Sequence, residues 1–286
     1  MAYTRFFYIF RAINIFTFLF RYDILNIPLG KGEEKVKNIF SFVLLVCLCA
    51  SLCACIPMEV LSPQESIPAL PDDGRIGVVL DAGHGFGDPG CASEYLQGTE
   101  AEVTLDMVNL LAKELTSLGA EVVLTHDGER FPTAEEIITL CVDNGVDYRA
   151  DLMVEDTVFS AYERGIYVLA LSKELPIDFF VSLHVNNFPS DPSVDRYELF
   201  YYENNPYHLL IDDFCVSFAE KLDNTARTVA LDKDNAYIVT KYGSYPSVLI
   251  ETGFASNSSA AEKLNSDTWR AEFCKTLAQE IIDMIQ

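Results

Sequence analysis

Residues 80–90, LDAGHGFGDPG, follow the short apolar run IGVV at 76–79. An apolar run of this length, ended by glycines, is typical of a buried strand, and glycine allows the backbone to bend sharply afterwards. The bend carries a single histidine, His84, with one aspartate on each side. We therefore expect a strand that ends at one edge of a sheet, with His84 in the turn that follows.

The rest of the chain continues this pattern of apolar strands and amphipathic helices. Strands are expected at 76–81, 121–125, 178–184, 197–202 and 247–251. Apolar residues at helical spacing predict helices within 105–115, 210–222 and 269–281, and Ser259 with Glu262 predicts a capping box that opens a short helix. The alternation predicts an α/β fold: a twisted, mostly parallel sheet with helices on both faces, in a single catalytic domain over residues 76–286.

Composition limits the partners of this domain. The formal net charge is −23, whereas a nucleic-acid-binding surface is basic, so no nucleic acid is expected. No CxxC pair lies after residue 55, so a zinc site made of cysteines is not expected. Export would permit disulfides, but the domain cysteines allow several pairings and can equally remain free thiols.

The first 75 residues differ from the rest. Residues 36–55 are predicted to be a signal peptide that ends in Leu52-Cys53-Ala54-Cys55, which resembles a bacterial lipoprotein box. Lipidated Cys55 would hold an exported protein on the outer side of the membrane, in the cell envelope; an ordinary cleaved signal is the alternative. We hypothesise that translation starts at Val36, so that residues 1–35 are not part of the protein; the alternative is a first membrane helix. Proline-rich residues 56–75 are expected to be a flexible tether.

Residues 127–160 interrupt the strand–helix rhythm. This segment is rich in Asp and Glu and is expected to be partly helical around 134–142. We interpret it as an acidic insertion. A lid, an arm that binds a regulatory protein, and a surface loop without such a role all remain open.

Four chemically competent side chains fall at one predicted edge of the sheet. His84, His184 and Glu251 each end a strand, and Glu100 stands at the start of a helix. Taken singly, each has an ordinary structural explanation, such as a helix-start carboxylate for Glu100. Together, two histidines and a glutamate match a catalytic zinc site with one open position, and the second glutamate can act as the base.

The complete set of motifs resembles the zinc-dependent N-acetylmuramoyl-L-alanine amidases. The matching segments are DAGHGFGDPGCA (81–92), EAEVTL (100–105), LGAEVVLTH (118–126), YERGIYVLA (162–170), FFVSLHVNN (179–187), YELFYY (197–202) and SVLIETGFASNSSAAEKL (247–264). The resemblance implies that His84, Glu100 and His184 bind Zn²⁺ and that Glu251 acts catalytically. It also implies a cell-wall hydrolase that cleaves the amide between N-acetylmuramic acid and L-alanine in peptidoglycan. Residues 127–160 lie outside the resemblance.

The sequence departs from this family at three places, none of which removes a ligand. Gly85-Phe86-Gly87 replaces the usual Gly-Gly after the first histidine, Cys91 interrupts a usual Gly-Ala pair, and His126 stands where arginine is usual.

Other residues near the motifs are given different roles. Glu100 is preferred to Glu94 and Glu102 as the ligand, because its distance to Leu105 matches the family pattern. His126 and His208 are expected to be structural or exposed. Asn186 and Asn187 are candidates for contact with substrate.

Three alternative functions remain at this stage. The chain could be a zinc amidase or peptidase of the same fold that cuts another amide, or a catalytically silent wall-binding lipoprotein. It could also be an amidase that residues 127–160 hold inactive, by presenting a carboxylate to zinc until a regulatory partner binds.

Overall fold

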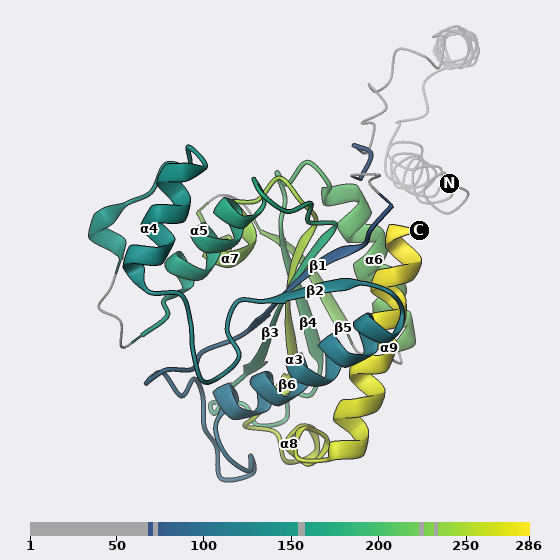
Figure 1. Cartoon of the computed structure of the whole chain (residues 1–286). Helices are drawn as coiled ribbons and strands as arrows, with labels where there is room; N and C mark the ends of the chain where they lie inside the picture. Colours follow the sequence, from purple (N-terminus) through teal and green to yellow (C-terminus); the bar gives the residue numbers. More distant parts are fainter. Residues whose placement is uncertain (1–67, 71–73, 154–157, 223–225, 232–233) are drawn as a thin grey trace, which may run out of the picture. The chain divides into compact units, whose positions relative to one another are not determined.

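Six strands form one sheet in the computed structural model, which describes residues 68–70, 74–153, 158–222, 226–231 and 234–286 (Figure 1). The strands are β1 (Gly77–Ala82), β2 (Glu121–Leu124), β3 (Phe179–Asn186), β4 (Tyr197–Tyr202), β5 (Ala226–Leu231) and β6 (Ser247–Phe254). Their order across the sheet is β2-β1-β3-β6-β4-β5. All neighbouring strands are parallel except β4 and β6, which are antiparallel. The predicted α/β fold with a mostly parallel sheet is confirmed.

The described helices cover both faces of this sheet. They are α3 (Glu100–Ser117), α4 (Ala134–Asp143), α5 (Ala161–Leu171), α6 (His208–Lys221), α7 (Ile238–Lys241), α8 (Ser258–Leu264) and α9 (Asp267–Ile285), with a short 3₁₀ turn, η2 (Ala150–Leu152). None of these helices is long and apolar enough to span a membrane. The predicted signal peptide at 36–55, the segment 1–35 and most of the tether at 56–75 lie outside the described residues.

Side chains alternate between the two faces along each strand, and this alternation divides the core. Val78 and Leu80 of β1 belong to the larger cluster, with residues of α3, α6 and α9. Val79 belongs to a smaller cluster on the opposite face, with residues of α5 and α7. Figure 1 shows the two groups of helices on opposite sides of the sheet.

The single tryptophan of the chain lies in the larger cluster. Trp269, near the start of α9, stacks nearly parallel to Tyr197 at a centroid distance of 6.3 Å. It also packs on Phe273 at 5.1 Å. These rings join α9 to the beginning of β4.

The described part of the acidic insertion packs onto α5. Helix α4 begins after a capping box formed by Thr133 and Glu136, close to where the sequence predicts a helix. Its buried Ile137 and Cys141 form a third apolar cluster with residues of α5. The insertion therefore has a small core of its own on the α5 side of the sheet.

Two local expectations are corrected. Strand β5 was not predicted, because its apolar run is only three residues long, Val229-Ala230-Leu231, and the strand is partly exposed. Helix α8 is predicted at the right place with the wrong cap: the side chain of Asn257, and not that of Ser259, accepts the hydrogen bond from the N–H of Ala260. Asparagine is as good an N-cap as serine, and it stands two residues earlier.

Candidate metal centre

The ends of β1, β3 and β6 bring the predicted residues to one edge of the sheet. In the direction of the chain, β1, β3 and β6 are parallel, so their carboxyl ends share this edge. Strand β4 runs the other way and begins at the same edge. His84 lies in the turn after β1, and His184 and Glu251 lie side by side in register on β3 and β6.

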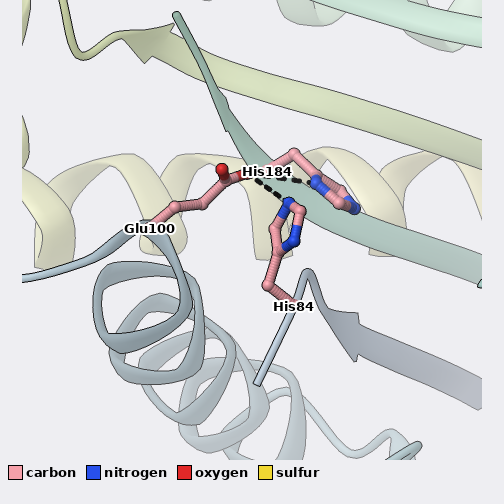
Figure 2. Close-up of side chains that lie close together, drawn as sticks. All are labelled: His84, Glu100 and His184. Atoms are coloured by element: carbon pink, nitrogen blue, oxygen red, sulfur yellow. Dashed lines mark hydrogen bonds and ion pairs between the residues drawn. The ribbon is translucent and has the colours of Figure 1, made fainter. Parts of the chain in front are cut away.

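Three of these residues form a compact cluster of possible metal ligands. His84, Glu100 and His184 offer ligand atoms that all lie within 4.8 Å of one another. Glu100 Oε1 is 3.2 Å from His84 Nε2 and 3.1 Å from His184 Nδ1. Figure 2 shows the carboxylate facing both imidazoles, and the three side chains come from three separate segments of the chain. Two imidazoles and one carboxylate are the ligands of many catalytic zinc sites.

A capping box positions Glu100. The Thr99 side chain accepts from the N–H of Glu102, and the Glu102 side chain accepts from the N–H of Thr99. Glu102 is therefore occupied at the helix start, while Glu100, the first residue of α3, is buried in the cluster. Exposed Glu94 is not part of the cluster, so the structure favours Glu100 over both alternatives.

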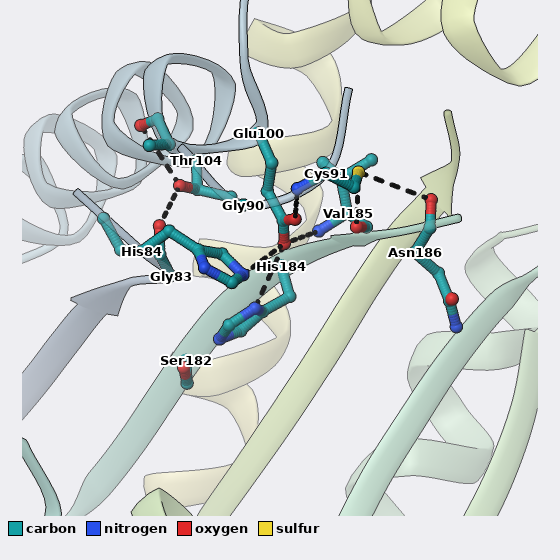
Figure 3. Close-up of polar contacts among 12 residues, drawn as sticks. Gly83, His84, Gly90, Cys91, Glu100, Thr104, Ser182, His184, Val185 and Asn186 are labelled. Atoms are coloured by element: carbon teal, nitrogen blue, oxygen red, sulfur yellow. Dashed lines mark hydrogen bonds and ion pairs between the residues drawn. The ribbon is translucent and has the colours of Figure 1, made fainter. Parts of the chain in front are cut away.

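The carboxylate of Glu100 is anchored on both oxygens (Figure 3). Oε1 accepts from the N–H of Val185 at 2.9 Å, and Oε2 accepts from the N–H of Cys91 at 2.8 Å. Burial alone would raise the pKa of Glu100, but hydrogen bonds from the two histidines and these two amides hold that pKa far below its ordinary value. Glu100 is therefore ionised and fixed in orientation, as a metal ligand must be.

Two glycines allow the cluster to be this compact. A Cβ atom on Gly83 would lie 2.5 Å from Cε1 of His184. A Cβ atom on Gly90 would lie 2.6 Å from Oε2 of Glu100. Any larger residue at either position would have to displace a candidate ligand, which explains the glycine-rich composition of this stretch.

Asp88 orients the first histidine. Its Oδ2 lies 2.8 Å from Nδ1 of His84, which leaves Nε2 directed towards Glu100. Burial lowers the pKa of His84, but hydrogen bonds to Glu100 and Asp88 raise it, to about 9 overall. A carboxylate on the second ring nitrogen is a common support for a metal-binding histidine. The support of His84 by Asp88 was not predicted from sequence, although an aspartate four residues after a histidine in a glycine-rich turn was a usable signal.

A buried ion pair supports the turn that carries His84. Arg164 of α5 donates to Asp81 Oδ1 at 2.9 Å, and both side chains are buried. The guanidinium also donates to the carbonyl oxygens of Ala82 and His84. Asp81 accepts further hydrogen bonds from Thr125 and Ser182. The pair thus ties the end of β1 to α5, a role that requires the tertiary structure and was missed from sequence.

Glu251 differs from Glu100 in having no fixed partner. It is 8% exposed, and its Oε2 is buried with no hydrogen-bond partner among the described residues. Burial, then the nearby carboxylates of Glu100 and Glu198, raise the pKa of Glu251 to about 8, although His84 lowers it. Glu198 lies opposite Glu251 on β4 and accepts from Arg196 Nε at 2.9 Å.

Glu251 and the two histidines open into one cavity of about 150 Å³. The cavity lies on the α5 and α7 side of the sheet. Its lining comes from the ends of β1, β3 and β6, the turn after β1, and the starts of α5 and α7: Asp81, His84, Asp88, Phe159, Ser160, Ala161, Arg164, His184, Tyr237, Ile238, Val239, Leu249 and Glu251. A cavity with a largely apolar lining and a few convergent titratable groups is the usual form of a catalytic site.

The other histidines, Asn186 and the described cysteines do not belong to the ligand cluster. His126 is buried with Nε2 2.9 Å from the carbonyl oxygen of Ala82, and burial lowers its pKa. His208 begins α6, at the opposite edge of the sheet. The amide of Asn186 donates to Glu198 at 2.8 Å, so its side chain is already engaged. The cysteines of the described residues, Cys91, Cys141, Cys215 and Cys274, are free thiols.

The chain also matches known proteins in sequence and in fold. Residues 78–285 match the protein family described as N-acetylmuramoyl-L-alanine amidase. The chain belongs to this family, as the sequence motifs predict.

Individual proteins resemble the chain in sequence or in structure. The chain is 28% identical over 214 residues to the uncharacterized protein YqiI of Bacillus subtilis, covering 74% of this chain and 86% of YqiI. It is 29% identical over 196 residues to the N-acetylmuramoyl-L-alanine amidase LytC of the same organism, covering 68% of this chain but only 32% of LytC. A solved N-acetylmuramoyl-L-alanine amidase from Clostridium difficile 630 has a TM-score of 0.56 at 19% identity, covering 73% of this chain and 96% of that one. The structural likeness supports the shared fold.

Proposed function

We propose that the chain is a zinc-dependent cell-wall hydrolase that cleaves the amide between N-acetylmuramic acid and L-alanine in peptidoglycan. The observation that carries the proposal is one cavity that unites the His84–Glu100–His184 cluster with the unpartnered carboxylate of Glu251. Membership of the amidase family supports the choice of substrate.

The donor set fits Zn²⁺ better than a hard cation such as Mg²⁺, because imidazole nitrogens are typical zinc ligands and Mg²⁺ prefers oxygen. When bound, Zn²⁺ would polarise the carbonyl of the scissile amide and lower the pKa of a water molecule beside it. His84 Nε2, His184 Nδ1 and a Glu100 oxygen would hold the ion, and the hydrogen bonds to Asp88, Cys91 and Val185 would fix two of these ligands in orientation.

Glu251 would move the proton of the reaction. Its unpartnered Oε2 is free to accept a proton from the attacking water, and it would then donate that proton to the amine nitrogen that leaves. A pKa raised to about 8 suits this exchange, because the group can hold and release a proton near neutral pH.

The expected cellular context belongs to the same proposal. We propose export through the signal peptide at 36–55 and attachment to the outer side of the membrane through lipidated Cys55. The tether at 56–75 would let a domain beginning near residue 76 reach the cell wall. Translation from Val36 would leave residues 1–35 out of the protein.

The test measures zinc content and peptide release from peptidoglycan with the purified full chain. We expect one zinc per chain and free stem peptides that begin with L-alanine. Glu251→Gln should keep the zinc and lose about 10²–10⁴-fold in rate. The control Glu121→Gln changes an exposed carboxylate on β2 and should keep the rate. Peptides with a different first residue would refute the proposed bond, and an active Glu251→Gln variant would refute the proposed base.

A further inference from the structure

The turn that carries His84 has an unusual backbone. His84, Gly85, Phe86 and Gly87 have φ angles of +67°, +98°, +49° and +87°. Residues with a Cβ atom rarely adopt this left-handed region, and bulky ones do so only when their surroundings hold them there. Phe86 is the bulky residue in this turn, so its neighbours should show what holds it.

An aromatic cluster holds Phe86, and we define it as Phe86, His126, Phe131 and Phe159. The ring of Phe86 lies 4.4 Å from that of Phe131 and 5.2 Å from that of His126. Phe131 in turn stacks on Phe159 at 5.2 Å, with an angle of 22° between the ring planes. Phe131 and Phe159 both belong to the acidic insertion, and Phe131 makes the shortest contact to Phe86.

The position of Phe86 is coupled to the candidate ligand His84. Phe86 lies inside a turn closed by two backbone hydrogen bonds, from Gly85 N to Asp88 O at 2.8 Å and from Asp88 N to Gly85 O at 3.1 Å. Asp88 is the residue whose carboxylate lies 2.8 Å from His84 Nδ1. A displacement of Phe86 therefore displaces Asp88 and, with it, the support of the imidazole.

We propose that Phe131 is a positioning residue for His84 and that it acts through Phe86 and the Gly85–Asp88 turn. The acidic insertion then supports the metal site, and the proposal rests on the proposed binding of zinc there. If the insertion instead held the enzyme inactive, its removal would free the metal site. The present proposal predicts that removing residues 127–158 weakens zinc binding.

The described carboxylates of the insertion are consistent with a supporting role and not with an inhibitory one. Within residues 127–153 and 158–160, no Asp or Glu belongs to the candidate ligand cluster. Glu155 and Asp156 lie outside the described residues.

The test is the dissociation constant for zinc, measured by competition with a chelating dye on the purified full chain. Phe131→Ala should bind zinc about tenfold more weakly, the range found when a supporting neighbour of a metal ligand is lost. Phe131→Leu keeps an apolar side chain of similar reach and should restore most of the affinity. The control Val142→Ala changes a side chain of the same insertion that is 63% exposed, and it should bind zinc within about twofold of the unsubstituted chain.

A second substitution separates positioning from general packing. Phe86→Gly removes the ring through which Phe131 acts, so it should weaken zinc binding about as much as Phe131→Ala does. Phe131→Ala should then cause no further loss in the Phe86→Gly background. Unchanged zinc affinity in Phe131→Ala, or losses that simply multiply in the double variant, would overturn the proposal. Absence of zinc from the unsubstituted chain would overturn the proposed function as well, so the two failures are distinguishable.

Discussion

Glu251, the proposed base, lies in an environment that disfavours its charged form. Its ordinary pKa is 4.5, and burial, Glu100 and Glu198 raise it to about 8 in the folded chain without metal. Between these values the unfolded chain has released a proton that the folded chain retains. The stability that this group contributes is therefore complete below pH 4.5, and it is lost as the pH rises to about 8.

The first prediction follows for the metal-free protein. Glu251→Gln cannot ionise, so it should unfold at a higher temperature than the unsubstituted chain at pH 9. The gain in unfolding free energy should be roughly a few kcal/mol and should shrink steadily as the pH falls towards 5. Thermal unfolding followed by circular dichroism across this range checks it. A gain that is independent of pH would show that ionisation of Glu251 is not its cause.

The second prediction concerns His84. Its pKa of about 9 means that the metal-free imidazole is protonated at pH 7 and must lose that proton before Nε2 can bind zinc. Zinc binding at pH 7 should release about one proton from this histidine, and affinity should increase with pH until about 9. Calorimetry in buffers of different ionisation enthalpy measures the release. Equal heats in all buffers would contradict the prediction.

At the scale of elements, the start of α3 connects helix formation to the metal site. Thr99, directly before the candidate ligand Glu100, closes a capping box with Glu102, two residues after it. The start of α9 offers a comparable cap far along the chain, where Ser266 accepts from the N–H of Trp269 at 3.3 Å. The two caps should contribute similarly to stability, and only the first should affect a ligand.

The third prediction uses this pair. Thr99→Ala and Ser266→Ala should each lower the unfolding free energy by about 1 kcal/mol, because each leaves a helix N–H without its cap. Thr99→Ala alone should also weaken zinc binding, since it loosens the first turn that holds Glu100. Urea unfolding and zinc titration of both variants provide the comparison. Equal zinc affinity in the two variants would show that the Thr99 cap does not support the metal site.

The elements show which features could be predicted from sequence. Long apolar periodicity predicts α3, α6 and α9, and apolar runs predict β1, β3 and β6, because burial on one or both faces determines these patterns. Strand β5 could not be predicted, since its residues are partly exposed and its pairing with β4 is seen only in the folded structure. The reversed direction of β4 against β6 likewise has no local signal.

The site divides in the same way. His84, Glu100, His184 and Glu251 could be chosen because each stands at the end of a strand or the start of a helix. Arg164 could not, because its contacts with Asp81 and with the carbonyl oxygens of the turn join residues about eighty positions apart. Such partners become visible only when α5 is packed on the sheet.

At the scale of the whole molecule, we expect the fold not to depend on the metal. Three apolar clusters, built from the sheet and its helices, contain most of the buried hydrophobic side chains of the described residues, and the candidate ligands stand at one edge outside them. This contrasts with small zinc domains, in which metal binding supplies the folding free energy.

The fourth prediction is that a chelator removes activity and leaves the fold. Far-ultraviolet circular dichroism should be unchanged in EDTA, while the melting temperature should fall because a ligand that binds only the folded state no longer stabilises it. Added zinc should restore both the melting temperature and peptide release. Loss of the helical signal in EDTA would show that the metal is part of the folding core.

The position of Trp269 gives these experiments an internal optical probe. It is the chain's single tryptophan, and it stacks with Tyr197 and Phe273 in the α3, α6 and α9 layer, on the face of the sheet opposite His184 and Glu251. Because indole fluorescence responds to its immediate surroundings, the emission of Trp269 follows loosening of that layer. Emission that stays constant while zinc leaves, and shifts only on heating, would distinguish an emptied site from an unfolded chain in the same cuvette.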